Sequence, residues 1–166
     1  MKLPERIHKL EQRARDLASL RAQGDDGTYK RAARHFYDDL RAAWERALEE
    51  VAFAHVIMRH RDQIKPKDLP HVSALTRQDC QVWTNNFNKC CGLMAGHDQS
   101  RGRNRATPEP DELLQDAQAL ETWVRSLRDQ QKTIVQVSIG IPVAAAATVD
   151  SHQLTNTAKP STLDRH

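Results

Sequence analysis

The segment from Tyr29 to Gln63 contains neither proline nor glycine, and apolar residues recur along it every three or four positions. Residues at this spacing share one face of an α-helix, which completes a turn every 3.6 residues. The apolar positions are Ala33, Phe36, Tyr37, Leu40, Trp44, Ala47, Leu48, Val51 and Met58. We therefore expect one long amphipathic helix from about Tyr29 to about Gln63, whose apolar face must be buried by other elements.

Helices are also expected over residues 4–22, 76–94 and 110–131, the first and last of which show the same helical period. Thr76 and Asp79 form a capping-box pattern at the start of the second of these segments. With 28% charged, 39% hydrophobic and 5% aromatic residues, the composition is typical of a helix-rich protein with a modest core. The sequence predicts an all-α fold, an antiparallel helical bundle. The expected anchors of its core are Trp44, Trp83 and Trp123.

The expected organisation has three parts. Residues 1–24 form a coiled-coil-like amphipathic helix, residues 28–131 a helical bundle domain, and residues 132–166 a flexible, largely disordered tail. The first helix is too short for a stable free-standing coiled coil, so it must pack on the rest of the chain or on a partner. Residues 133–149 carry no charge but include polar residues and a proline, which makes a membrane span a poor interpretation. A short strand, a tethered arm or disorder is expected there.

Several function classes lack their sequence signatures. The chain has no phosphate-binding loop, no dinucleotide-binding glycine motif, no zincin motif and no nucleophile elbow. Cys80, Cys90, Cys91 and His97 do not have the spacing of a structural zinc site, so we expect no metal and no cofactor. The odd number of cysteines and the lack of a signal-like segment indicate a reduced, cytoplasmic protein without a membrane partner. A formal net charge of +3 leaves the nature of the partner open.

Arg41, Glu45 and His97 are the candidates for catalysis. Arg41 and Glu45 are four residues apart, on one face of the expected long helix. Such a pair is commonly a surface ion pair, but an arginine also holds a phosphate while a glutamate and a histidine exchange protons with a ribose 2′-hydroxyl. His97, followed by Asp98, lies just beyond a helix end, where it is either a surface side chain or an acid or base.

Arg101, Arg103 and Arg105 form a short basic segment. Arginines of this kind contact nucleic-acid phosphates, which makes these residues candidates for nucleic-acid binding. A solvated loop has the same composition, and no aromatic residue lies between the arginines to stack on bases.

The run from Phe36 to Val51 resembles the C-terminal helical region of large bacterial AAA-family ATPases, the SMC-like group that includes the RloC- and PrrC-type anticodon nucleases. Further matches are Cys90 and residues 96–99, 108–113 and 120–124, which occur in the same order. Together they cover roughly residues 3–131. The ATPase motifs of that family are absent from this chain.

The resemblance implies a non-ATPase helical interaction or effector module of the kind found in phage-defence ATPases. Its implied partner is a separate ATPase subunit, and self-association through helix 4–22 is the alternative. The resemblance also implies a second possible function, a metal-independent endoribonuclease of the anticodon-nuclease type that acts on RNA. Arg41 and Glu45 match the arginine and the glutamate four residues later in such nucleases, and His97 is the best match to their distal histidine.

Overall fold

The computed structural model describes residues 2–59, 61–94 and 106–140 of the chain, with side chains up to residue 135 in the last range. These residues contain helices and no strand, which confirms the predicted all-α class. The helices are α1 (Leu3–Ala22), α2 (Asp26–Ala47), the π-helix η1 (Leu48–Ala52), the 3₁₀-helix η2 (Pro66–Asp68), α3 (Leu69–Val72), α4 (Arg77–Leu93) and α5 (Pro110–Gly140). Within this part of the chain, none of them is both long and apolar enough to span a membrane.

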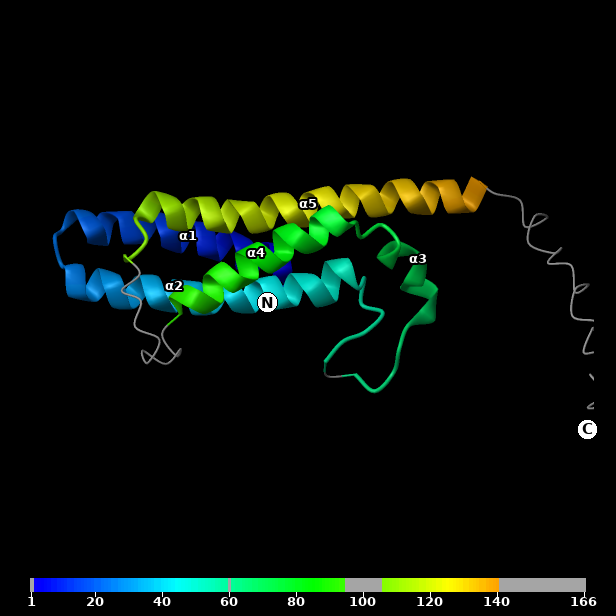
Figure 1. Ribbon diagram of the computed structural model, residues 1–166, viewed down its shortest axis with the longest axis horizontal. Helices are drawn as coiled ribbons and strands as arrows, with labels where there is room; N and C mark the ends of the chain where they lie inside the picture. The colour runs from blue at the N-terminus through cyan, green and yellow to red at the C-terminus, as the bar shows by residue number, and fades with distance from the viewer. Residues whose placement is uncertain (1, 60, 95–105, 141–166) are drawn as a thin grey trace, which may run out of the picture.

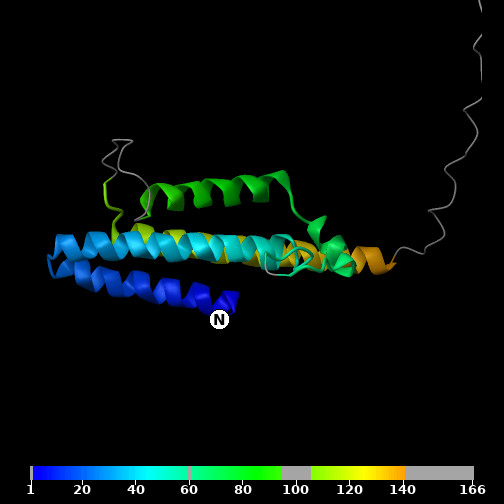
Figure 2. The same cartoon turned by 90° about the horizontal axis from the view of Figure 1, so that it is seen from below.

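Figure 1 shows the course of the long helices, and Figure 2 shows that they lie in three layers. α2 and α5 run side by side in the middle layer, and Figure 2 shows α1 on one face of this pair and α4 on the opposite face. A tight turn at Gly24, whose φ of 80° suits glycine, reverses the chain between α1 and α2. The arrangement is the predicted antiparallel bundle.

The apolar stripe of α1 is buried in the same core as α2 and α5. Its buried positions are Leu3, Ile7, Leu10, Ala14 and Leu17. Full burial of one leucine or isoleucine side chain contributes roughly 1.5–3 kcal/mol. The stripe therefore packs on the rest of the chain, and in this fold it is not an exposed surface for self-association through helix 4–22.

Local sequence signals determine where α2 and α4 begin. Asp25 is the N-cap of α2, and its carboxylate accepts a hydrogen bond of 2.9 Å from the Thr28 backbone N–H. Thr76 caps α4 and forms the predicted capping box with Asp79. Caps of this kind contribute about 1 kcal/mol each.

Three tryptophans tie α2, α4 and α5 together. Trp44 on α2 is fully buried, and its ring centroid lies 5.6 Å from that of Trp123 on α5. Trp83 on α4 donates its indole N–H to the Trp44 carbonyl oxygen at 3.0 Å, and Trp123 donates to the Asp79 carbonyl oxygen of α4 at 3.0 Å. Each pair of these helices is thus joined by a tryptophan. The predicted anchor role is confirmed for Trp44 and Trp123, whereas Trp83 is only partly buried.

The helix expected from Tyr29 to Gln63 is shorter than predicted. The α-helix ends with α2, η1 follows, and Ala54 and His55 have positive φ values of 46° and 59°. The chain reverses at this point, which buries Val56. The tertiary contacts made after the reversal outweigh the local preference of this segment for a helix.

The last helix is longer than predicted and continues to Gly140 instead of ending near Gln131. Gln131 Nε2 donates hydrogen bonds to the carbonyl oxygens of Val51 (2.7 Å) and His71 (3.3 Å), and Ile134 packs against the core. The extra turns, which were expected to belong to a disordered tail, are therefore held by η1 and α3. The remainder of that tail lies outside the described residues.

Replacing Trp44 by alanine removes the largest of the fully buried side chains. We expect the free energy of unfolding to fall by about 3–5 kcal/mol, measured by urea denaturation. Trp83→Ala is the comparison, and it should cost less because its side chain is partly exposed. An unchanged urea midpoint for Trp44→Ala would contradict the position of this side chain at the centre of the core.

Candidate functional site

Arg41 and Glu45 lie on the side of α2 that faces α4. Arg41 Nη1 donates a 2.5 Å hydrogen bond to Glu45 Oε1, and both side chains are partly buried. The guanidinium carbon of Arg41 lies 5.8 Å from the ring centroid of Phe87 on α4, and Phe87 stacks on Trp83. The structure therefore brings together the first two members of the predicted catalytic set.

Two residues that the sequence analysis did not identify complete this cluster. Arg59 Nη1 donates to Glu45 Oε2 at 2.9 Å, and Arg59 Nε donates to Glu49 Oε1. Glu49 is buried in η1. We call Arg41, Glu45, Arg59 and Glu49 the charged row. On the expected straight helix, Arg59 would lie about 20 Å from Glu45 along the axis, so no helical spacing could have predicted this contact.

The charged row is better suited to holding the fold than to proton transfer. Each carboxylate oxygen of Glu45 accepts a hydrogen bond from an arginine, whereas a general base needs an oxygen that is free to take a proton from its substrate. The hydrogen bonds that Arg59 donates to Glu45 and Glu49 raise the pKa of its guanidinium. Two cations and two carboxylates alternate, so the row has no excess charge with which to attract a phosphate.

The other predicted site residues cannot be placed. His97, Arg101, Arg103 and Arg105 lie outside the described residues. Their roles in catalysis and in nucleic-acid binding stay predictions. Among the residues that the structure describes, no three histidine, cysteine, aspartate or glutamate side chains gather to form a metal site.

The chain between η1 and η2 forms a loop (Figure 1), which we call the closed loop because a backbone hydrogen bond joins its ends. The Lys65 N–H donates to the Val56 carbonyl oxygen at 3.1 Å, which ties the ends of the loop together, and the Arg61 N–H donates to the Met58 carbonyl oxygen at 3.1 Å. The loop follows two non-glycine residues in the left-handed region, a costly backbone conformation that surrounding contacts must maintain. The ion pairs of Arg59 with α2 and η1 supply such contacts.

Among the residues that the structure describes, the exposed large hydrophobic side chains lie on this loop and at the first residue of α3. Ile57, Ile64 and Leu69 are 56%, 65% and 57% exposed, and they are the exposed large hydrophobic residues of the described chain. Ile57 and Ile64 are direct neighbours of the two residues that close the loop, so the closure holds them near each other. We call Ile57, Ile64 and Leu69 the aliphatic platform.

A second polar cluster joins α2, α4 and α5. The Tyr37 hydroxyl donates to Asp116 at 2.7 Å, and Lys89 forms ion pairs with Asp116 and Glu112 at 2.7 and 2.8 Å. Burial and the bond to Asp116 raise the pKa of Tyr37, and burial raises the pKa of the adjacent Cys90 thiol to about 12. Tyr37 is fully buried and Cys90 nearly so, which leaves a substrate no access to them. The cluster is a link between helices.

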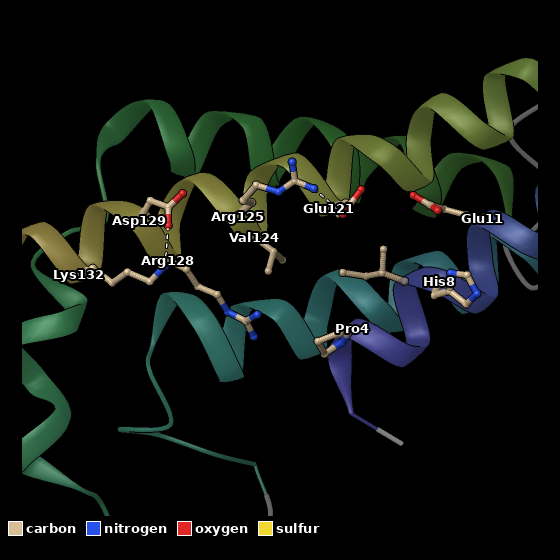
Figure 3. A pocket seen from close by; sticks show the side chains of 10 residues that line it. Pro4, His8, Glu11, Glu121, Val124, Arg125, Arg128, Asp129 and Lys132 are labelled. Atoms are coloured by element: carbon tan, nitrogen blue, oxygen red, sulfur yellow. Dashed lines mark hydrogen bonds and ion pairs between the residues drawn. The ribbon is translucent and has the colours of Figure 1, made fainter.

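A groove of about 360 Å³ lies between α1 and α5 (Figure 3). Pro4, Ile7 and Val124 line its apolar part. On its rim, Arg125 pairs with Glu121 at 2.7 Å and Lys132 pairs with Asp129 at 2.8 Å. His8, Glu11 and Arg128 also line the groove, so its lining mixes both signs of charge with a small apolar part.

Comparisons with protein-family models, with curated proteins and with solved structures give no match for this chain.

Replacing Arg59 by methionine removes both ion pairs that hold the closed loop against α2. Since exposed or partly exposed pairs contribute up to about 1 kcal/mol, we expect the Lys65 amide to exchange its hydrogen about fivefold faster, measured by NMR. Arg61→Met is the matched control on the same loop, because Arg61 has no ion pair with any described residue. Equal exchange rates in both variants would show that Arg59 does not hold the loop.

The buried acids make the stability of the fold sensitive to alkali. Burial raises the pKa values of Tyr29 and Cys90 to about 12, against ordinary values of 10.0 and 9.0, and raises that of Tyr37 as well. Above about pH 9 the unfolded chain loses protons that the folded chain retains, so the free energy of unfolding should fall as pH rises towards 12. Urea midpoints between pH 7 and 11 measure this fall, and Tyr37→Phe should flatten it. Midpoints that stay constant would contradict the burial of these groups.

Proposed function

We propose that this protein is a non-catalytic helical module that binds another protein, and that the aliphatic platform is its contact surface. The observation that carries the proposal is the position of the exposed large hydrophobic residues. Those of the described chain come from residues 57–69 alone, on the closed loop and at the start of α3. Elsewhere in the bundle the large apolar side chains face the core or pack against it.

The part of the platform on the closed loop is held by contacts with the rest of the chain, which is a further property of binding surfaces. The backbone bond between Lys65 and Val56 closes the loop, and Arg59 anchors it to Glu45 and Glu49. Ordering a loop at the moment of binding costs free energy, and a loop that is already ordered avoids this cost. Exposed aliphatic side chains on a fixed loop are suited to fill pockets on a partner.

The resemblance to the C-terminal region of AAA-family ATPases supports a separate ATPase as the partner. The alternative function, a metal-independent ribonuclease, is supported by the contact between Arg41 and Glu45. It is weakened by the second arginine on Glu45, which occupies the remaining carboxylate oxygen. We therefore favour the interaction module.

The proposal is tested by co-expressing the full chain with each AAA-family ATPase of the same genome that lacks a region of this kind. We expect one of them to co-elute with the chain in size-exclusion chromatography. The double substitution Ile57→Ser and Ile64→Ser should weaken that complex at least about tenfold, because aliphatic anchors dominate the binding energy of such contacts.

Gln63→Ser is the matched control, since Gln63 is an exposed polar residue of the same loop. It should leave the complex unchanged. If no such ATPase binds, or if the double substitution binds as tightly as the natural chain, the proposal is wrong.

A further inference from the structure

The aliphatic platform is interspersed with positive charge. Arg61 lies between Ile57 and Ile64 in the sequence, and Lys65 and Lys67 lie between Ile64 and Leu69. Arg61 and Lys67 are exposed and Lys65 is half-buried. Within the described part of the chain, none of these three cations forms an ion pair.

Neighbouring carboxylates cancel only part of this charge. Glu45 forms ion pairs with Arg41 and Arg59, and Glu49 forms one with Arg59. Glu50 forms an ion pair with Arg46. The stretch itself contributes two carboxylates, Asp62 and Asp68. The exposed Arg61 and Lys67 and the half-buried Lys65 therefore leave this stretch, which also carries the three aliphatic side chains, with one excess positive charge.

We infer that the aliphatic platform binds an acidic segment of a partner protein, one that carries aliphatic side chains between its carboxylates. This inference rests on the proposed function, because it names the chemistry of the partner at the same surface. The aliphatic groups of the segment contact Ile57, Ile64 and Leu69. Its carboxylates pair with the three cations, which sets the orientation of the segment and speeds its association.

A second copy of this chain is a poorer occupant. A twofold contact places the same surface on both sides, so the excess positive charge would face itself. An anionic membrane is poorer as well, because Asp62 and Asp68 would face head groups of the same sign. A peptide avoids both conflicts, since it can place a basic residue opposite each aspartate.

The inference is tested by selecting peptides from a random display library on the immobilised full chain and then measuring how tightly the recovered peptides bind the Ile57→Ser/Ile64→Ser variant. Recovered sequences should be rich in aspartate and glutamate together with leucine, isoleucine or phenylalanine. The best peptide should bind Arg61→Glu/Lys67→Glu about tenfold more weakly than the natural chain. A version of the peptide with its carboxylates replaced by lysine should restore binding to that variant.

Lys9→Glu/Lys30→Glu is the matched control. It makes the same change in charge at two exposed lysines of α1 and α2 and should leave the affinity unchanged. Circular dichroism of each variant checks that the bundle is intact.

The outcomes separate the two proposals. If the isoleucine substitutions abolish peptide binding and the charge reversal does not, the acidic partner is wrong and the platform remains a binding surface. If neither changes binding, both proposals fail. Two further results would overturn the acidic partner. One is a concentration-dependent dimer in sedimentation that the isoleucine substitutions abolish. The other is binding to phosphatidylserine vesicles that the same substitutions abolish, with no peptide recovered.

Discussion

The contact among Trp44, Trp83 and Trp123 is the constraint on which the rest of the structure depends. α4 packs on the opposite face of the bundle from α1 (Figure 2), and two indole N–H bonds to backbone carbonyl oxygens fix its position along α2 and α5. A hydrogen bond to a specific carbonyl specifies one register between two helices, which apolar contact alone does not. That register places Phe87 against Arg41.

The same contact lies where the α-helix α2 gives way to the π-helix η1. The Trp44 carbonyl oxygen accepts hydrogen bonds from both the Leu48 backbone N–H and the Trp83 side chain. The π-helix begins at Leu48, and a side chain that inserts into the hydrogen-bond ladder is a recognised cause of such irregularity. The change in winding is followed by the reversal at Ala54 and His55. The closed loop and the charged row both follow from that reversal.

The sequence predicted those features of the fold that depend on a local pattern of residues. The period of apolar residues predicted the helices, and the pairing of Thr76 with Asp79 predicted the start of α4. The absence of proline and glycine from residue 111 to residue 139 was a signal, which we missed, that α5 continues to Gly140. The spacing of Arg41 and Glu45 predicted their contact because both lie on one regular helix.

The contacts that the sequence pattern did not predict depend on the tertiary structure. The reversal after η1 places Arg59 beside residues ten and more positions earlier, and its cause is the packing of α4 and the burial of Val56 rather than any glycine or proline. A helical period cannot predict such a contact, because the same residues fit a continuous helix equally well. The exposed positions of Ile57 and Ile64 have the same origin.

We propose that this protein acts by binding another protein, and that Glu45 serves in ion pairs and not in proton transfer. The most direct measurement is cleavage of labelled tRNA by the purified full chain, with and without EDTA and with any ATPase that binds it. The account predicts no cleavage above that of buffer alone. Cleavage that survives EDTA, is lost in Glu45→Gln and His97→Ala and persists in Asp38→Asn would contradict it.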